Sequence, residues 1–264
     1  MAQKTFTNPV LLAVLNTVTL AFMLWANYWA NSGAMNGNSV GQISRQYDNL
    51  FTPASYAFSI WGIIFLGLFA FVINQWVQVA KGKTTEVQQA GIWFAATNIL
   101  NGLWTIIWLS EMPGLSVIIM LLLLTSLTIL VIRLNMEKWD APMKIIGWTW
   151  WPIAIYYGWI VLATVANISA WLVSINWQFL FGEVAWTIIM IVVAVTVYVF
   201  LIATRNLRES ALVGIWGLYA IVSKQIDLHP SIAYTAIGGI VVLGIFCSIH
   251  AFNNRSTLPF IGSK

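Results

Sequence analysis

The sequence is poor in charged residues. Asp, Glu, Lys and Arg make up only 8% of its 264 residues and 60% are hydrophobic, whereas soluble domains carry roughly 25% charged residues. A water-soluble protein could not solvate so apolar a surface, so this shortage excludes a soluble domain. Because a bilayer-spanning chain must satisfy its backbone polar groups internally, the apolar runs predict an all-α, multi-pass membrane helix bundle. The basic residues lie in short loops, not on one face, so we expect no nucleic-acid partner.

The sequence also lacks the residue sets that most catalytic and metal sites need. Cys247 is the only cysteine and lies in an apolar run, which excludes an intrachain disulfide and gives no sign of redox chemistry. His229 and His250 fall at opposite ends of the last apolar run, and Asp227-x-His229 is only a weak metal motif. No Ser/His/Asp set, Gly-rich phosphate loop or His/Cys cluster is evident. We therefore expect no catalytic residue, no metal site and no obligatory cofactor, and an enzyme is disfavoured.

Eight apolar runs are candidates for membrane-spanning helices, which need about 20 residues each. The first could instead be a signal peptide, but its apolar stretch is long for one and a single Lys precedes it. Thr52 followed by Pro53 is typical of an N-cap and a first-turn proline, and predicts where the second helix begins. The seventh run is the shortest. The predicted spans are 9–30, 54–79, 91–110, 114–133, 145–173, 182–203, 210–224 and 231–251.

The basic residues are divided unequally between the two sides of such a bundle. With eight spans, ten Lys and Arg residues fall on the side of both termini, and two fall on the opposite side. Since positively charged loops stay in the cytoplasm, we expect cytoplasmic termini and a location in the bacterial inner membrane. The ten are Lys4, Lys81, Lys83, Arg133, Lys138, Lys144, Arg205, Arg208, Arg255 and Lys264, and the two are Arg45 and Lys224.

Tryptophan is abundant, with 16 residues. Most of them lie near predicted span ends, where aromatic belts are typical, but Trp61, Trp104 and Trp159 lie inside their spans. Asn101 and Trp104 share a helical face, and from Trp159 to Trp171 polar and aromatic residues recur every four positions along another. An indole N–H inside a membrane needs a hydrogen-bond partner. These positions therefore indicate a polar and aromatic cluster within the bundle.

At about 1.5 Å of rise per residue, this cluster lies at one depth in the outer half of the membrane. It lies beneath an outer loop at 31–53, a length that is often found in lids and binding loops; a plain connector is the alternative. We predict a lidded cavity for a flat, largely apolar ligand, and the alternative is an interhelical amide pair packed with aromatic rings. The predicted ligand-binding residues are Trp61, Phe65, Asn101, Trp104, Trp159, Ala163, Asn167 and Trp171.

Three motifs in these spans resemble a known family. The segment FTPA at 51–54, followed by Phe58 and by WGIIF at 61–65, resembles the second-helix entry of the translocator protein/tryptophan-rich sensory protein (TspO) family. The segment LNGLW at 100–104 is similar to its Leu-Asn-x-x-Trp motif on the third helix. The family's usual double proline is reduced here to Pro53-Ala54. Residues that resemble its fifth-helix pattern are Pro152, Tyr156, Trp159, Asn167 and Trp171.

The resemblance covers about residues 10–175. It implies a five-helix, translocator-like core at 1–175 and leaves 176–264 as an additional three-helix membrane segment. It also implies a pocket that binds porphyrins or other lipophilic molecules, with roles in tetrapyrrole handling, transport or sensing. A porphyrin or other tetrapyrrole is the expected ligand, and a carotenoid or a lipid is left open. Haem iron is disfavoured because the proposed cavity residues include no His, Cys or Met.

Two other functions are left open. The chain could be a structural or regulatory subunit of a membrane complex, for instance a pigment–protein assembly, in which the added helices dock a partner. A porphyrin-modifying enzyme is a weaker alternative, since light-dependent porphyrin degradation is attributed to microbial members of the family that the motifs resemble. The expected partners are the lipid bilayer, a lipophilic small molecule, and either a second copy of the chain or a membrane-complex subunit.

Overall fold

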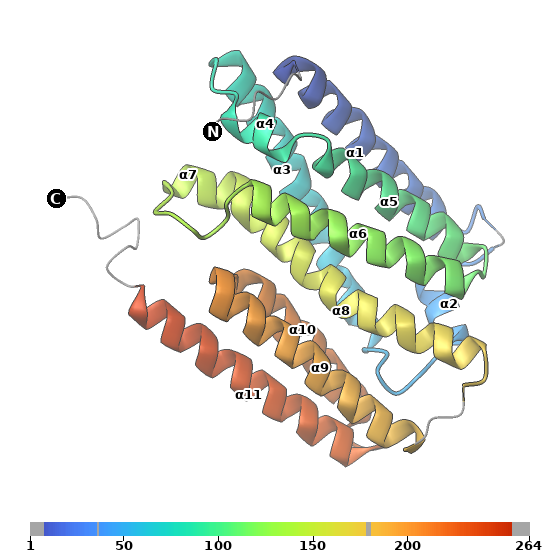
Figure 1. Ribbon diagram of the computed structural model, residues 1–264. Helices are drawn as coiled ribbons and strands as arrows, with labels where there is room; N and C mark the ends of the chain where they lie inside the picture. The colour runs from blue at the N-terminus through green and yellow to red at the C-terminus, as the bar shows by residue number, and fades with distance from the viewer. Residues whose placement is uncertain (1–7, 36, 178–180, 255–264) are drawn as a thin grey trace.

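The computed structural model describes residues 8–35, 37–177 and 181–254, and within them every regular element is helical. Each of the eight predicted apolar runs forms one long helix, and these helices lie side by side in a bundle (Figure 1). The predicted all-α membrane bundle is thus confirmed. The long helices are α1 (Pro9–Asn31), α3 (Ile60–Ala80), α5 (Trp93–Leu109), α6 (Pro113–Arg133), α8 (Trp151–Ser174), α9 (Gly182–Arg205), α10 (Arg208–Gln225) and α11 (Pro230–Asn253).

Six of the long helices, in the part of the chain that the structure describes, are long and apolar enough to cross a membrane. The other two are α5, with 17 residues, and α10, with 18 residues. The ends of α10 carry Arg208, Glu209 and Lys224, which shortens its apolar stretch. Both shorter helices are nevertheless packed into the bundle, α5 between α1 and α6, and α10 against α8, α9 and α11.

Short elements connect the long helices. They are α2 (Val40–Gln46), the 3-10 helix η1 (Ser55–Ser59), α4 (Thr85–Ala90), α7 (Met143–Ile145) and the π-helical turn η2 (Ile146–Trp150). The predicted helix start at Thr52–Pro53 is wrong, because helical structure begins only at Ser55. The reason is a long-range bond: the backbone N–H of Ala54 donates to the carbonyl of Ala220 on α10, at 3.1 Å.

The helix α8 lies at the centre of the bundle. In the most apolar stretch of the span Met143–Ser174, which contains α8, 72% of the residues are buried. The corresponding value for α11 is 28%. One side of α8 packs against α3 and α6, and α10 packs along it as well. Small residues allow this close approach, which is a common basis of helix association in membranes. The Ser210 hydroxyl donates to the Ala154 carbonyl and the Tyr198 hydroxyl to the Gly158 carbonyl, both at 2.7 Å.

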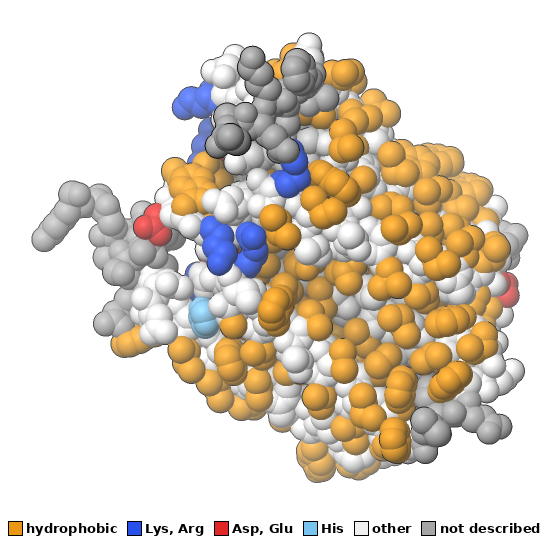
Figure 2. Space-filling view, in the orientation of Figure 1, with side chains coloured by type: hydrophobic (Ala, Val, Ile, Leu, Met, Phe, Trp, Pro, Cys, Tyr) orange, Lys and Arg blue, Asp and Glu red, His pale blue; other side chains and the backbone are white. Residues whose placement is uncertain are grey.

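The charged side chains are separated from the apolar surface. Figure 2 shows Lys and Arg gathered towards one end of the bundle, while hydrophobic side chains cover much of the face between the two ends. This end holds α4, α7 and the last residues of α11 (Figure 1). We call it the basic end. The unequal distribution of charge predicted from the sequence is therefore present along the bundle.

Candidate functional site

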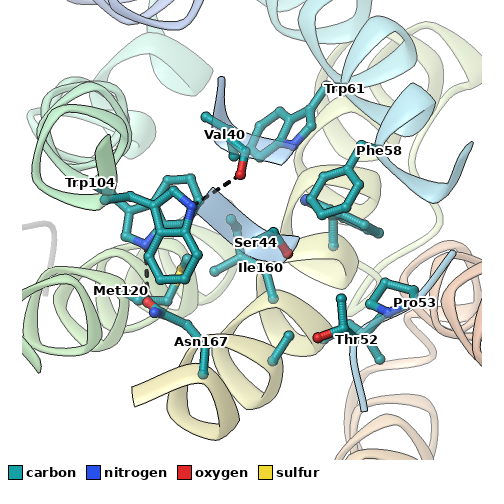
Figure 3. A pocket seen from close by; sticks show the side chains of 16 residues that line it. Val40, Ser44, Thr52, Pro53, Phe58, Trp61, Trp104, Met120, Ile160 and Asn167 are labelled. Carbon is teal, nitrogen blue, oxygen red and sulfur yellow. Dashed lines mark hydrogen bonds between the residues drawn. The ribbon is translucent and has the colours of Figure 1, made fainter. Parts of the chain in front are cut away.

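A cavity of about 60 Å³ lies near the end of the bundle opposite the basic end, beneath α2 (Figure 3). The chain builds it from segments that are far apart in the sequence: α2, the stretch before η1, and the long helices α3, α5, α6 and α8. We call it the aromatic cavity. Its lining is Val40, Ser44, Thr52, Pro53, Phe58, Trp61, Trp104, Trp108, Met120, Trp159, Ile160, Leu162, Ala163, Ala166, Asn167 and Ala170.

One wall of the aromatic cavity is fixed by a chain of hydrogen bonds. The indole N–H of Trp104 donates to Oδ1 of Asn167 at 3.0 Å, and Nδ2 of Asn167 donates to the hydroxyl of Ser116 at 2.8 Å. All three side chains are buried. In a membrane interior no water is at hand to replace such a partner, so the bonds hold the Trp104 ring in place. The ring stacks on Trp108, with 5.8 Å between centroids and 13° between planes.

The facing wall is made of further aromatic rings. Trp61 stacks on Phe65 with 5.3 Å between centroids, and Trp159 meets both Trp61 and Phe58 edge-on, at 6.4 Å and 5.8 Å. Within residues 8–35, 37–177 and 181–254, the indole N–H groups of Trp61 and Trp159 make no hydrogen bond. This wall therefore offers flat apolar surfaces together with two spare donors.

The outer loop covers the cavity. Its helix α2 begins with a capping box, in which Ser39 and Gln42 bond to each other's backbone N–H. The Trp108 indole N–H donates to the Val40 carbonyl at 3.2 Å, and Nε2 of Gln46 donates to Oε2 of Glu111 at 3.0 Å. The loop is thus a folded cover, attached to α5 through Trp108 and to the α5–α6 connection through Glu111. A plain connector, the alternative considered for 31–53, does not describe this arrangement.

A second hollow of about 330 Å³ adjoins the first. The two share Val40, Phe58, Trp61 and Trp104, so these four side chains form a thin wall between them. The second hollow is more polar, because α1 and the loop contribute amide and hydroxyl groups to it. These polar lining residues are Asn27, Asn31, Ser39 and Ser55.

Six of the eight predicted ligand-binding residues line one or both hollows, and two do not. The six are Trp61, Phe65, Trp104, Trp159, Ala163 and Asn167. Asn101 is directed to α1 instead: its Oδ1 accepts from Nδ2 of Asn27 at 2.9 Å, and it is buried. Trp171 packs against the start of α6, where a Cβ on Gly114 would lie 3.1 Å from its Nε1. For Asn101 the structure thus shows an amide pair between two helices, which was the alternative to a ligand site. Its partner in that pair is Asn27 on α1.

The structure adds residues that the sequence did not single out. Met120 lies in the lining, although no Met was expected there, and a thioether is one of the side chains that can ligate haem iron. It stands in a uniformly apolar stretch of α6, so neither spacing nor polarity distinguished it. Among the described residues, no group of three or more His, Cys, Asp or Glu side chains could hold a metal ion.

Comparison with known families agrees with this architecture. A family model described as TSPO-like protein matches residues 13–249. The matched region is most of the chain, and it continues past residue 175, where the motif resemblance ends, through α9 and α10 into α11. No curated protein and no solved structure matches the chain.

Proposed function

The chain belongs to the TSPO-like protein family and is an integral membrane protein of that type, and from this premise we propose that the aromatic cavity binds a flat, largely apolar ligand. A porphyrin or another tetrapyrrole is the favoured ligand, and a carotenoid or a lipid is the alternative. Binding would serve transport or sensing. No catalytic residue is part of this proposal.

The observation that supports the proposal most directly is the hollow among tryptophan rings. Bundle interiors are normally close-packed, yet here Trp61, Trp104 and Trp159 surround open space beneath a folded cover. Their ring faces suit stacking against a planar molecule, and the spare indole N–H groups of Trp61 and Trp159 suit acceptors on its edge. The Trp104–Asn167 bond holds one of these rings in a fixed orientation.

The size of the cavity indicates how a ligand would enter. Pockets for molecules of drug size usually measure about 300–1,000 Å³, and the aromatic cavity measures about 60 Å³. A porphyrin therefore requires the two hollows to merge, which means moving the side chains of the shared wall. Val40 belongs to α2, so displacement of α2 would open the wall and admit the ligand in one motion. Two hydrogen bonds would break during entry, the one from Trp108 to the Val40 carbonyl and the one from Gln46 to Glu111.

A cavity-filling variant tests the proposal. In Ala163→Phe the new ring would occupy the aromatic cavity, so we expect metal-free porphyrin to bind at least about tenfold more weakly, a loss of about 1.4 kcal/mol. The matched control is Ala21→Phe, because Ala21 is exposed on α1. Binding is measured by titrating the purified protein with porphyrin and following both Trp fluorescence quenching and porphyrin absorbance. Equal affinity of Ala163→Phe and the unmodified chain would overturn the assignment of this site.

A further inference from the structure

An open cavity of about 490 Å³ lies at the basic end. It is bordered by the segment 137–141, the start of α8, the α9–α10 connection and the last turn of α11, and we call it the basic-end cavity. Figure 1 shows where these segments meet, near the ends of α7, α9 and α11. Charged side chains from two of these segments, 137–141 and the α9–α10 connection, line it. None of its lining residues belongs to the aromatic cavity, so it is a separate site.

Two guanidinium groups in the basic-end cavity have unused hydrogen-bond donors. Nη1 of Arg205 and Nε of Arg208 are buried and have no hydrogen-bond partner. Nor does either Arg lie within 4.0 Å of a carboxylate in the part of the chain that the structure describes. A buried charged donor without a partner is destabilising. An anion in the cavity beside the two guanidinium groups would offset their charge.

Two of the three carboxylates in the same cavity accept a hydrogen bond from a neutral side chain. Oε2 of Glu137 accepts from Nδ2 of Asn206 at 3.1 Å, and Oε1 of Glu209 accepts from the Trp151 indole N–H at 3.1 Å. Burial, reinforced by repulsion from Glu209, raises the pKa of Glu137 to about 7. Near neutral pH its carboxyl group is therefore partly protonated, and it opposes an incoming anion less than a full negative charge would.

Further features of the cavity favour an anion. Lys138 adds a third cationic group, and its Nζ donates to the Thr204 carbonyl at 2.6 Å. The helix α10 begins at Arg208, which lines the cavity, so the positive end of its helix dipole lies there. Asp140 and His250 are the other titratable groups in the lining.

The position of the cavity suits a lipid headgroup. Trp139 and Trp151, which line it, are 46% and 41% exposed, and partly exposed tryptophans are typical of the level where headgroups lie. Basic pockets between membrane helices commonly bind phosphate-bearing headgroups. Arginine is well suited to this because its planar fork matches the oxygen atoms of a phosphate.

We propose that the basic-end cavity binds a phosphate group, held between Arg205 and Arg208 and drawn in by Lys138. The source of the phosphate is either the headgroup of an anionic phospholipid or free inorganic phosphate. This inference does not depend on the proposed porphyrin site, and its test uses different residues and different ligands.

The test measures thermal stabilisation of the full chain, purified in neutral detergent, by three probes. These are a short-chain phosphatidylglycerol, a short-chain phosphatidylcholine as the zwitterionic comparison, and inorganic phosphate. Stabilisation by phosphatidylglycerol alone identifies the lipid source, and stabilisation by inorganic phosphate as well identifies free phosphate as sufficient. Stabilisation by none of the probes, or by all equally, overturns the proposal.

Variants connect the effect to the cavity. In the double variant Arg205→Gln, Arg208→Gln we expect binding of the effective probe to weaken about tenfold or more. The matched control is Lys81→Gln, Lys83→Gln, which removes the same charge at the same end but outside the cavity. If the arginine variant does not fold, Ala203→Leu narrows the cavity at an exposed position and keeps every charge. Unchanged binding in the folded arginine variant or in Ala203→Leu contradicts the proposal.

Discussion

The aromatic cavity and the basic-end cavity lie near opposite ends of one bundle, and α8 contributes to both. In the first, Asn167 is satisfied by Trp104 and Ser116. In the second, two arginines keep buried N–H groups without partners. A polar group in the hydrocarbon is costly without a partner inside the protein, whereas one at the headgroup level can use water or a lipid. The lining of the aromatic cavity is mostly apolar, whereas the lining of the basic-end cavity carries charged side chains.

The largest expected effect is on stability, and it comes from disturbing the close contact between α8 and α10. In Gly158→Ala the added Cβ would lie 2.6 Å from the carbonyl oxygen of Ser210 and 2.7 Å from its Cα. These are backbone atoms and cannot turn aside, so we expect a loss of about 1–3 kcal/mol or more from overpacking. The melting temperature in detergent measures this loss of stability. Porphyrin and phosphate binding are measured on the same variant.

The control for this variant is Gly244→Ala on α11, where an added Cβ meets nothing within 4 Å. Alanine is a better helix former than glycine, so this change should be neutral or slightly stabilising. If Gly158→Ala melted at the same temperature as Gly244→Ala, the contact between α8 and α10 would not be tightly packed.

The next largest effect is expected at the paired amide of the aromatic cavity. Trp104→Phe keeps an aromatic ring but removes the donor, which leaves the buried Oδ1 of Asn167 without its partner at a cost of about 1–3 kcal/mol. We expect a lower melting temperature and weaker porphyrin binding. The comparison variant is Trp76→Phe, whose indole N–H donates to Thr17 at a site that is 39% exposed. Equal losses in the two variants would contradict the distinction between deep and peripheral polar groups.

Dependence on pH should be confined to the basic-end cavity. The pKa of Glu137 is raised from 4.5 to about 7 in the folded protein, first by burial and then by Glu209. A raised carboxyl pKa means that the folded state holds the proton more tightly than the unfolded state. The resulting stability is full below about pH 4.5 and is lost as the pH rises through about 7.

We therefore expect the melting temperature of the unmodified chain to fall across this window, and that of Glu137→Gln to fall less. Glu183→Gln, which changes an exposed carboxyl at the start of α9, should keep the full dependence on pH. The aromatic cavity has no Asp, Glu, Lys, Arg or His in its lining, so porphyrin affinity should change little over the same range. An identical pH profile for Glu137→Gln and the unmodified chain would show that another group is responsible.

The sequence predicted the residues of the aromatic cavity better than those of the basic-end cavity. The spacing of Trp159, Ala163 and Asn167 placed all three on one face of α8, and that face does line the cavity. Periodicity could not show which neighbour each face meets. Asn101 comes one turn before Trp104, and that small rotation about the helix axis is enough to direct it to Asn27 on α1 instead of the cavity.

The parts that sequence reasoning missed depend on long-range contacts. Nothing local indicates that α2 is held by Trp108 and Glu111, or that α10 bonds to Ala54 and so delays the start of the second helix. The basic-end cavity combines residues from four separate segments, and the two that carry its Lys, Arg, Asp and Glu side chains resemble ordinary charged turns. Topology alone brings Glu137, Arg205 and His250 to one hollow.

The smallest effect is expected from the ion pair between Lys224 and Asp48, which joins α10 to the outer loop. The two side chains are 26% and 49% exposed, and exposed pairs of this kind contribute about 0–1 kcal/mol. Two other bonds hold the same segment without charge, from Gln225 to the Leu50 carbonyl at 2.8 Å and from Ala54 to the Ala220 carbonyl at 3.1 Å. Lys224→Gln should therefore lower the melting temperature only slightly, and less so in high salt. A double-mutant cycle with Asp48→Asn measures the coupling energy of the ion pair. A value well above 1 kcal/mol would mean that charge, and not the uncharged hydrogen bonds, holds the cover over the aromatic cavity.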